Sequence, residues 1–395
     1  MKYAILVGDG MADAPIDAIG GLTPLEHAST PHMDSIAARG RVGLVKTVPD
    51  GMAPGSDVAN MSLLGYNPAQ YYSGRAPIEA ASMGIRLAET DTAFRCNLVH
   101  IEAGRMVDYS AGHIETKDAH RLIKDLQQLN TDARRFYPGV SYRHLLVLRD
   151  FPQGGLALSP PHDISGKPVA GYVPTGPGDT ILADLSAEAH EILAGAGTNR
   201  ARAAAGKTTA TDIWLWGHGK AVSLPTLGER FGLRGSVISA VDLVRGLGKL
   251  AGLTVRIVEG ATGYLGTNYA GKVAAARAAL DAEDFVYLHV EAPDETSHEG
   301  SLEKKLQAIE EFDRHVVGEM LKLQDTHNDM RVLVLPDHGT WLSLKTHHRA
   351  PVPFAVAGAG IRPDGGRVYC ERAAADKPLY EGVSLFETFV NGTFS

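Results

Sequence analysis

Short apolar runs that stop at an acidic side chain recur along this sequence and constrain its fold more than any other feature. Residues 2–8 (KYAILVG) run directly into Asp9, residues 285–290 (FVYLHV) end shortly before Asp294, and residues 331–335 (RVLVL) end just before Asp337. Runs of this length and composition are typical of buried strands that end at a loop. A further run of this kind covers residues 253–258.

Helical segments separate these predicted strands. A helix is expected after Thr30-Pro31, because Thr is a good cap and Pro is tolerated at the first helical position. Residues 269–280 and 301–323 also have a helical pattern. Strands that alternate with helices predict an α/β fold with a mostly parallel sheet and helices on both of its faces.

The middle of the chain has a different character. At 395 residues the chain is too long for one ordinary core, so two domains are expected. Strand-like pieces at residues 96–101 and 145–148 stand among loops rich in Pro and Gly, such as residues 159–178. We predict a smaller α+β domain over residues 89–222, inserted into an α/β domain that residues 1–88 and 223–395 build together.

Composition excludes several classes of protein. The net charge of −8 and the lack of a basic block argue against nucleic-acid binding, although local cations or metal ions could still bind a small anion. The two cysteines are too few for a disulfide framework or a thiolate metal site and suit a reducing compartment. No apolar run approaches the roughly 20 residues of a membrane helix, and a cytoplasmic protein is expected.

Side chains that commonly bind metal ions follow the predicted strands. The carboxyl ends of parallel strands meet at one edge of a sheet, where ligand sites form. Taken alone, each acidic residue would be read as a turn or cap residue and each histidine as a surface group, but the same residue types recur at four such positions. Oxygen and imidazole ligands without thiolates suit Mn²⁺, Zn²⁺ or Mg²⁺, and so many ligands predict two ions. The candidate ligands are Asp9, Asp294, His298, Asp337, His338 and His347.

The candidate nucleophile is Ser56, within Pro54-Gly55-Ser56-Asp57. A helix that starts here would present free N–H groups and its dipole to a phosphate. A serine hydroxyl needs a base or a metal to activate it, and the Gly-x-Ser-x-Gly frame of a hydrolase triad is missing. Metal activation is therefore the simpler explanation, and the alternative is that Ser56 or Asp57 only caps a helix.

Another segment has a weaker resemblance to a phosphate-binding motif. Gly206-Lys207-Thr208 resembles the end of a nucleotide-binding loop, but position 201 is Ala where that motif requires Gly. No buried strand leads into the segment either. We interpret it as a surface loop or helix end.

Together these motifs resemble the alkaline phosphatase superfamily, and within it the archaeal-type branch of the cofactor-independent phosphoglycerate mutases. The resemblance rests on VGDGMAD around Asp9, PGSDVANMSLLGY around Ser56, DETSHEG around Asp294, PDHGT around Asp337 and HHRAPVP around His347. It extends to residues 74–84, 136–144 and 260–272, and so runs nearly end to end.

The resemblance implies an alkaline phosphatase-like catalytic domain with two divalent ions, Mn²⁺ being expected and Zn²⁺, Mg²⁺ or Co²⁺ being alternatives. One ion would be bound by Asp9, Ser56, Asp337 and His338, and the other by Asp294, His298 and His347. His347 is preferred to His348 because the family histidine lies six residues before the final Pro of its VP motif, here Pro353.

The resemblance also implies that the inserted domain supplies cations to a small phosphorylated acid and acts as a lid. The candidate substrate-binding residues are Arg75, His113, Arg143, His144, His162 and Asp163, each of which could instead be an ordinary surface or structural group. The implied reaction interconverts 3- and 2-phosphoglycerate through a phosphoserine, without added bisphosphoglycerate.

Three other functions fit the same residues. A metal-dependent phosphatase or phosphonate hydrolase would share the site but release phosphate to water. A homoserine kinase-like transferase would require ATP. A non-catalytic metal-binding protein would form no phosphoenzyme. The oligomeric state does not follow from the sequence.

Overall fold

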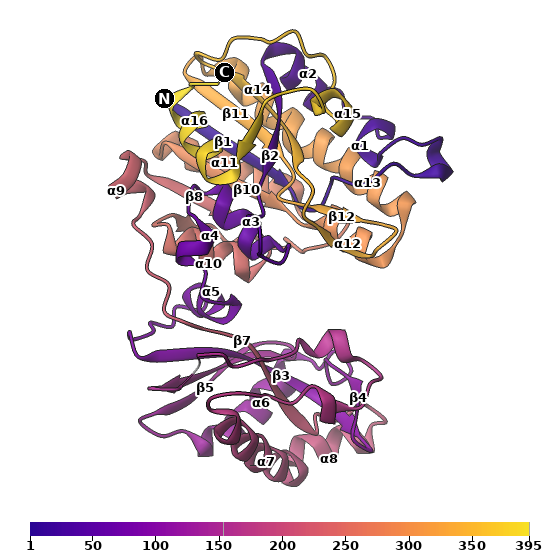
Figure 1. Cartoon of the computed structure of the whole chain (residues 1–395), viewed down its shortest axis with the longest axis vertical. Coiled ribbons are helices and arrows are strands. Elements are labelled where there is room, and N and C mark those ends of the chain that lie inside the picture. Colours follow the sequence, from indigo (N-terminus) through magenta and orange to yellow (C-terminus); the bar gives the residue numbers. More distant parts are fainter. Residues whose placement is uncertain (153, 395) are drawn as a thin grey trace. The chain divides into compact units, whose positions relative to one another are not determined.

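The chain divides into two compact units (Figure 1). The computed structural model describes residues 1–152 and 154–394. Unit 1 comprises Met1–Tyr72 and Ser223–Ser395, and unit 2 comprises Ser73–Val222. Both ends of the chain thus build one unit around an insertion. The insertion starts at Ser73, not at the expected residue 89, because α5 (Arg75–Ser82) packs its Ala76 and Ala80 against the sheet of unit 2.

Unit 1 is built on an eight-stranded sheet with the order β15-β2-β14-β11-β1-β10-β8-β9. All its strands run parallel except β14, which is antiparallel to both of its neighbours. A separate two-stranded ribbon joins β12 and β13. The strands of unit 1 are β1 (Lys2–Gly8), β2 (Arg41–Lys46), β8 (Gly235–Ile238), β9 (Thr254–Val255), β10 (Phe285–Val290), β11 (Met330–Leu335), β12 (Gly339–Trp341), β13 (Thr346–His348), β14 (Val352–Gly358) and β15 (Leu379–Glu381).

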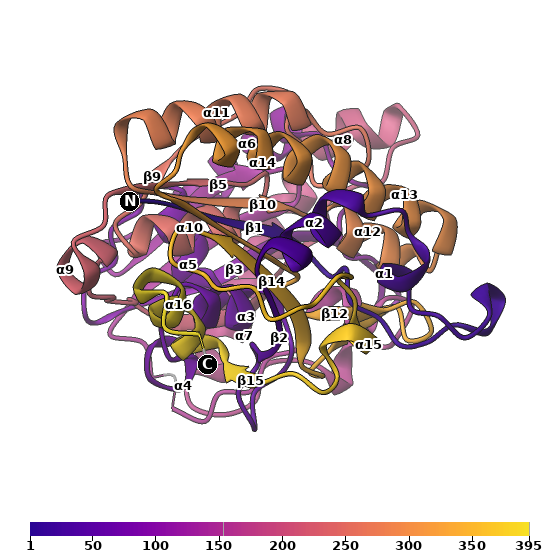
Figure 2. The same ribbon diagram turned by 90° about the horizontal axis from the view of Figure 1, so that it is seen from above.

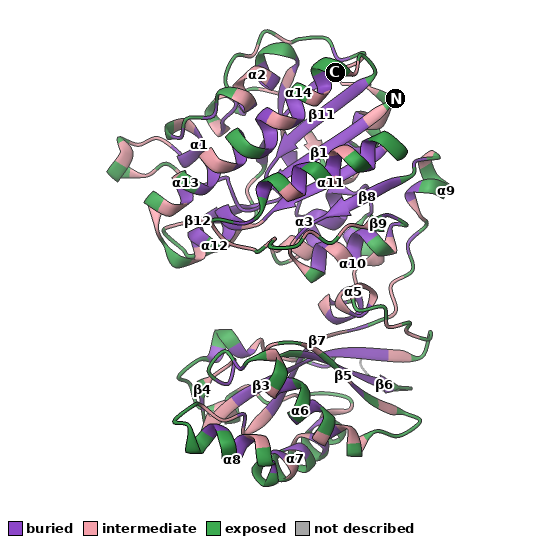
Figure 3. Ribbon diagram, turned by 180° about the vertical axis from the view of Figure 1, so that it is seen from behind, coloured by how far each residue is buried: buried purple, intermediate pink, exposed green. Residues whose placement is uncertain are grey.

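Helices cover both faces of this sheet, because its central strands are apolar on both sides. Ala4 and Leu6 of β1 face a core shared with α2, α11, α13 and α14, whereas Tyr3 of β1 packs on Phe389 of α16. Figure 2 shows the two helical layers on either side of β1 and β10, and Figure 3 shows the buried central strands. The predicted α/β fold class is confirmed. The helices of unit 1 are α1 (Pro24–His27), α2 (Pro31–Arg39), α3 (Ser56–Leu63), α4 (Pro68–Tyr71), α9 (Leu227–Phe231), α10 (Asp242–Leu250), α11 (Tyr269–Ala282), α12 (Ala292–Glu299), α13 (Leu302–Phe312), α14 (Gly318–Thr326), α15 (Glu371–Ala374) and α16 (Gly382–Asn391), with a 3₁₀ turn at Asp17–Ile19.

Two predicted elements differ in detail. The strand expected over residues 253–258 shrinks to β9, an edge strand of two residues. The helix expected over residues 301–323 is continuous, but it includes a π-helical stretch, Asp313–Val317, between α13 and α14. There Asp313 accepts the N–H groups of His32 and Met33 at 3.2 and 2.7 Å. Asp313 therefore caps α2, while the side chain of Thr30 makes no capping bond.

Unit 2 is a five-stranded antiparallel sheet with α6 and α7 on one face and α5 on the other. Its strands have the order β4-β3-β6-β5, with β7 paired to β3. One face packs against α6 and α7 through residues such as Phe94, Leu146 and Leu185. Beyond α5, its elements are β3 (Asp91–Glu102), β4 (Arg105–Asp108), α6 (Thr116–Leu126), β5 (Arg134–Val140), β6 (Arg143–Arg149), α7 (Asp179–Gly195), α8 (Gly197–Ala204) and β7 (Asp212–Lys220), with 3₁₀ turns at Gln127–Leu129, Pro161–Ile164 and Val169–Gly171.

The segment that resembles the end of a nucleotide-binding loop lies after a helix. The segment at residues 206–208 follows the end of α8, and Lys207 there pairs with the exposed Glu115 at 2.8 Å. Among the described residues, no helix combines the length and the apolar composition that crossing a bilayer requires.

Candidate metal centre

The register of three parallel strands brings acidic side chains to one place. Val7 of β1 lies opposite His289 of β10 on one side and opposite Leu335 of β11 on the other. The three strands therefore end level with one another, and the loops that leave them carry Asp9, Asp294 and Asp337 to the same sheet edge. All three carboxylates are buried, with 2%, 5% and 0% exposure respectively.

The first cluster combines helix α12 with the β12–β13 ribbon. Asp294 and His298 lie one turn apart on α12, and His298 Nε2 is 3.2 Å from Asp294 Oδ2. From β13, His347 Nε2 lies 3.5 Å from Asp294 Oδ1 and 3.0 Å from His298 Nε2. His298 Nδ1 contacts the carbonyl oxygen of Lys345 at 2.9 Å, which orients the ring. The next residue, His348, instead stacks on Trp341 with ring centroids 3.5 Å apart.

The second cluster surrounds Asp9. His338 Nε2 lies 3.4 Å from Asp9 Oδ1 and 3.6 Å from Asp337 Oδ2. Asp337 Oδ1 accepts the backbone N–H groups of Gly10 and His338 at 3.2 and 2.9 Å. These bonds hold the Asp337 carboxylate in one orientation.

Ser56 stands at the edge of the second cluster. It is the first residue of α3, and its Oγ forms a 3.1 Å hydrogen bond with Nε2 of His338. The preceding Gly55 has an extended backbone, with φ 178°, so it requires no left-handed conformation. The hydroxyl therefore lies where the N-terminal N–H groups of the helix favour a negatively charged group.

Burial and mutual charge set the ionisation of these groups. Burial, followed by the charges of Asp337 and Asp294, raises the pKa of Asp9 well above its ordinary value. Burial also acts to raise the pKa of Asp294, but its bonds from His298 and His347 outweigh this and lower that pKa well below its ordinary value. The bond to Asp294 raises the pKa of His298 to about 9. Such opposed shifts are typical of functional sites.

The donor set fits divalent cations. Three groups of described residues each place three ligand atoms within 4.8 Å of one another: Asp294, His298 and His347; Asp9, Asp294 and His338; and Asp9, His289 and Asp337. Asp9 Oδ1 is buried without a hydrogen-bond partner among the described residues. Because buried polar atoms are almost always paired, this oxygen is well suited to coordinate a cation. Carboxylate and imidazole ligands without a thiolate suit Mn²⁺, Mg²⁺ or Zn²⁺.

Unit 2 presents a cationic patch on the sheet face away from α6 and α7. Arg75 and Arg95 donate to the two oxygens of the Glu79 carboxylate at 3.0 and 2.9 Å. Arg143 lies near enough for its charge, with those of Arg95 and Arg75, to lower the pKa of Glu79 against the effect of burial. Arg95 was not among the predicted residues. It lies over the ring of Trp216, 4.1 Å from the centroid.

His113 and His162 meet in an aromatic group of unit 2. Both rings stand edge-on to Tyr109, with centroids 6.3 and 6.2 Å away, and His162 also contacts Trp216 at 5.3 Å. His113 has a left-handed backbone, with φ 47°. Asp163 is exposed and lies 3.7 Å from His162. The structure thus gathers these two histidines, with Asp163 beside one of them.

His144 does not join the other predicted residues. Adjacent residues of a strand face opposite sides of a sheet, so Arg143 and His144 cannot share one face. His144 is buried, and its Nδ1 accepts the N–H of Gly139 at 2.9 Å. Burial lowers its pKa to about 3, so the ring is neutral near pH 7. We correct the expectation for His144: it has a structural position.

Comparison with known proteins places this geometry in a family. A family model described as 2,3-bisphosphoglycerate-independent phosphoglycerate mutase matches residues 37–199. A protein of that name from Methanosarcina barkeri is 54% identical over 358 residues, covering 90% of this chain and 90% of the relative. A Geobacter sulfurreducens protein, a probable enzyme of the same name, is 50% identical over 399 residues, covering 99% and 100%. The chain belongs to the 2,3-bisphosphoglycerate-independent phosphoglycerate mutase family.

Solved structures share the fold of this mutase family member. The PH0037 protein from Pyrococcus horikoshii superimposes with a TM-score of 0.84 at 27% identity, covering 99% of this chain and 96% of that one. A cofactor-independent phosphoglycerate mutase from Thermoplasma acidophilum covers 100% of both chains with a TM-score of 0.67 at 24% identity. The agreement extends over both units of the chain.

Several residues around the mutase centre were missed by sequence reasoning. Asn60, one turn after Ser56 on α3, donates to Asp337 Oδ2 at 2.7 Å and to the carbonyl oxygen of Ser56 at 2.8 Å. Thr340 donates to Asp294 Oδ1 and contacts His338 Nδ1 at 3.2 Å. The spacing of four residues from Ser56 could have indicated Asn60. His289 gives no such signal, because it lies inside a strand rather than after one.

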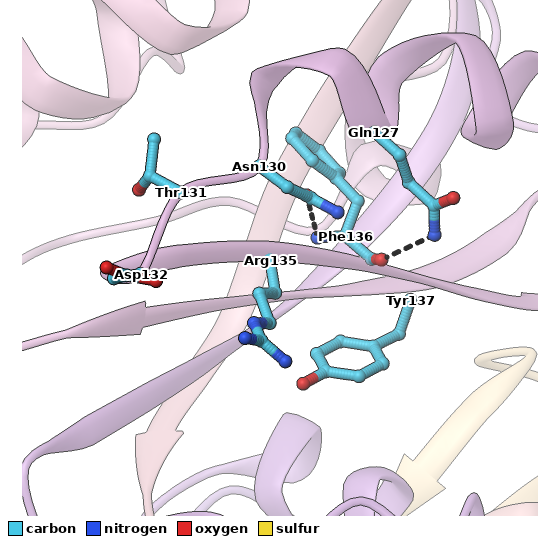
Figure 4. A pocket seen from close by; sticks show the side chains of 7 residues that line it. All are labelled: Gln127, Asn130, Thr131, Asp132, Arg135, Phe136 and Tyr137. Carbon is cyan, nitrogen blue, oxygen red and sulfur yellow. Dashed lines mark hydrogen bonds between the residues drawn. The ribbon is translucent and has the colours of Figure 1, made fainter.

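Unit 2 also has a hollow of about 730 Å³ beside β5, lined by none of the candidate site residues (Figure 4). Two of its lining side chains are engaged in local structure. Gln127 donates to the carbonyl oxygen of Phe136 at 3.1 Å, and Asn130 accepts the N–H of Phe136 at 2.9 Å. These bonds hold β5 against the turn that precedes it, and we assign the hollow no role in the mutase.

Proposed function

We propose that this protein interconverts 3-phosphoglycerate and 2-phosphoglycerate through a phosphorylated Ser56, without added bisphosphoglycerate. The observation that carries the proposal is the hydrogen bond between Ser56 Oγ and His338, at the edge of a buried cluster of carboxylates and imidazoles in a chain of this family. The close relatives bear the name of this activity.

Two divalent cations fit the proposed reaction. Asp9, Asp337, His338 and Ser56 would hold one, and Asp294, His298 and His347 would hold the other. When bound, such ions lower the pKa of a hydroxyl, neutralise phosphoryl oxygens and stabilise a departing alkoxide. We infer Mn²⁺ as the native ion, which the oxygen and nitrogen donor set supports.

The residues of the chain itself position the reacting groups. Helix α3 directs its N-terminal N–H groups toward a phosphoryl group at Ser56. Ser56 Oγ loses its proton and forms a bond to phosphorus, while the ester bond between phosphorus and the glycerate oxygen breaks and that oxygen gains a proton. The other glycerate hydroxyl then loses its proton as it takes the phosphoryl group back, and Ser56 Oγ regains a proton. Because phosphoryl transfer needs little covalent help from protein, this positioning supplies most of the catalysis.

The substrate also carries a carboxylate, which requires cations. We propose that the patch formed by Arg75, Arg95 and Arg143 in unit 2 binds anionic groups of the substrate, and that His113 and His162, with Asp163 beside them, complete this surface. Arginine suits planar anions because its guanidinium donates two parallel hydrogen bonds. The free, buried Cys96 and Cys370 support a reducing compartment, and we place the enzyme in the cytoplasm, in glycolysis or gluconeogenesis.

The decisive test is a product assay. The purified enzyme with Mn²⁺ is incubated with 3-phosphoglycerate, without bisphosphoglycerate or ATP, and scored separately for 2-phosphoglycerate and for inorganic phosphate. We expect the isomer and almost no phosphate. Phosphate as the main product would establish a phosphatase instead, and turnover that requires ATP would establish a kinase.

A serine variant tests the nucleophile. Ser56→Ala should lower turnover by at least about 10⁴-fold, because the variant lacks the hydroxyl proposed to carry the phosphoryl group. Ser62→Ala is the matched control, since Ser62 lies on the same helix, buried and without a bonded partner among the described residues. Near-normal turnover in Ser56→Ala would exclude Ser56 as the nucleophile.

A further inference from the structure

A left-handed turn follows strand β4 in unit 2. Ala111, Gly112 and His113 all have positive φ, at 50°, 70° and 47°. The N–H of Ile114 donates to the carbonyl oxygen of Ser110 at 3.2 Å, which closes these residues into one turn of left-handed α-helix. This conformation is strained for residues that carry a Cβ, and such residues normally adopt it singly. Two residues of this turn carry a Cβ, so the rest of unit 2 must hold the turn in place.

Asp108 holds the turn from its N-terminal side. Its Oδ1 accepts the backbone N–H and the hydroxyl of Ser110 at 2.7 and 2.6 Å, and its Oδ2 accepts the N–H of Gly112 at 3.0 Å. Ser110 Oγ in turn accepts the N–H of His113 at 3.0 Å. Burial acts to raise the pKa of Asp108, but these bonds from Ser110 and Gly112 outweigh it and lower that pKa. The carboxylate is therefore charged near pH 7 and accepts these hydrogen bonds strongly.

Arg202 of helix α8 holds the turn from the other side. It is buried, and its Nη2 donates to the carbonyl oxygens of Ala111 and Thr208 at 3.1 and 2.8 Å. Its Nη1 donates to Asp118 Oδ2 at 3.2 Å. Gly112 lies against Thr208, because a Cβ on this glycine would stand 2.8 Å from the threonine Cβ. Thr208, from the segment that resembles the end of a nucleotide-binding loop, thus helps to hold the turn.

The conformation of the turn fixes where the His113 imidazole lies. Its ring stands edge-on to Tyr109 and Tyr142, with centroids 6.3 and 6.1 Å away. The guanidinium of Arg143 lies over the same Tyr142 ring, 5.4 Å from the centroid. The exposed His113 therefore stands beside a member of the cationic patch of unit 2. Because φ sets the direction of Cβ, a change to negative φ at this residue would turn the imidazole away from these rings.

We propose that Asp108 and Arg202 are positioning residues for substrate binding: they hold the strained turn that places His113 next to the anionic groups of the substrate. This role rests on the proposed function, which assigns His113 to the surface that binds those groups. Strained backbone that its surroundings hold in place clusters at functional sites. Because the holding bonds exist before the substrate arrives, binding does not have to order the turn.

A double-mutant cycle tests whether Asp108 acts through His113. Binding of 3-phosphoglycerate is measured by calorimetry with Mn²⁺ present, in a common Ser56→Ala background that removes the proposed nucleophile. We expect His113→Ala to weaken binding by about 10–100-fold, as for the loss of a hydrogen bond to a charged group. Asp108→Ala should weaken it by about 10-fold when His113 is present and by less than about twofold in the His113→Ala background. Equal losses in both backgrounds would overturn the proposal, because a merely structural role does not require His113.

Two further variants test the strain itself. Adding Ala111→Gly to Asp108→Ala should restore about threefold in affinity, because glycine adopts the left-handed conformation without strain. No recovery would overturn the proposal. Arg202→Lys, whose single amine lacks the planar fork of donors, should behave like Asp108→Ala and replaces it in the cycle if that variant fails to fold. Glu115→Gln is the matched control with unchanged binding, since this exposed carboxylate lies near the turn but pairs with Lys207.

The cycle and the product assay can fail separately. Binding needs no turnover, so a phosphatase or a kinase that binds 3-phosphoglycerate would still show the coupling between Asp108 and His113. Uncoupled effects in an active mutase would overturn the role of the turn alone. A wild type that does not bind 3-phosphoglycerate would overturn both this role and the proposed substrate.

Discussion

At the scale of single residues, the carboxylate of Asp337 shows how the centre is held in place. It accepts two backbone N–H groups, from Gly10 and His338, and the side-chain amide of Asn60. Tyr287 in turn donates to the other end of the Asn60 amide. Asn60 therefore links helix α3, which carries Ser56, to the end of β11, and it orients an oxygen of the candidate ligand Asp337.

Removal of the Asn60 side chain should leave the Asp337 carboxylate less well oriented for a cation. We expect Asn60→Ala to weaken Mn²⁺ binding by about 10–100-fold, because groups that orient metal ligands contribute on this order. Isothermal titration with Mn²⁺ measures the effect. Asn67→Ala is the control, since Asn67 is exposed and caps the short helix α4. Unchanged Mn²⁺ affinity in Asn60→Ala would contradict this role.

Another residue-scale prediction concerns His144 and pH. Its pKa is about 3 in the folded protein against an ordinary value of 6.5. Between these values the unfolded chain binds a proton that the folded chain does not, so stability falls as pH falls below about 6.5. The slope from this group is at most about 1.4 kcal/mol per pH unit, and it vanishes above pH 6.5.

His144→Gln should remove that slope. Urea unfolding at pH 5 and pH 7, in a Trp341→Phe background, reports on unit 2 through its Trp214 and Trp216. We expect the difference in unfolding free energy between the two pH values to shrink by about 1–2 kcal/mol in the variant. An unchanged difference would show that His144 does not titrate this way.

At the scale of elements, a buried ion pair joins α13 to the loops that carry the candidate metal ligands. Lys305 of α13 has no exposed surface, and its Nζ donates to Asp13 Oδ2 and to the carbonyl oxygen of Thr340, each at 2.8 Å. Asp13 Oδ2 also accepts the N–H of Leu342 at 3.1 Å. The loop after β1 and the β12 strand are thereby tied to one helix.

Breaking this pair should destabilise unit 1 strongly. Lys305→Met leaves the Asp13 carboxylate buried and unpaired, for which we expect a loss of about 3–5 kcal/mol of unfolding free energy. The double variant Lys305→Met, Asp13→Asn should recover part of the loss, because the buried charge is gone. Denaturant unfolding followed by circular dichroism measures both. Lys304→Ala, which removes a half-exposed lysine paired with Glu299, should cause little change. An equally small effect of Lys305→Met would refute the prediction.

At the scale of the whole molecule, the groups of described residues that could hold a metal ion all belong to unit 1. Unit 2 has its own core between its sheet and the helices α6 and α7. A ligand that binds only the folded state stabilises it by about 2.7 kcal/mol at a hundredfold excess over its Kd. Cation binding should therefore stabilise unit 1 and leave the stability of unit 2 unchanged.

Hydrogen exchange can localise that effect. Adding Mn²⁺ to metal-free protein should slow amide exchange at the ends of β1, β10 and β11 and in α12, and leave β5 and β6 of unit 2 unchanged. Treatment with a chelator should reverse the change. Equal slowing in both units, measured by mass spectrometry of peptides, would show that the cations act on more than unit 1.

The sequence by itself determined the fold class and the candidate ligands, because both follow from local rules. Apolar runs mark buried strands, and parallel strands end together, so side chains that follow them converge. The proximity of Asp9, Asp294 and Asp337 could be predicted from the sequence for this reason. The start of the insertion could not be predicted, because α5 joins unit 2 through packing of Ala76 and Ala80 that no local pattern encodes.

Only the tertiary structure decided which groups orient and complete the centre. Asn60 and Thr340 contact candidate ligands through a helix face and a ribbon whose positions depend on packing across the whole unit. His289 reads as one more residue of an apolar strand until the register with β1 sets it beside Asp9. The family resemblance gave His144 as a candidate together with Arg143, but side chains alternate along a strand, so His144 lies on the opposite face of the sheet.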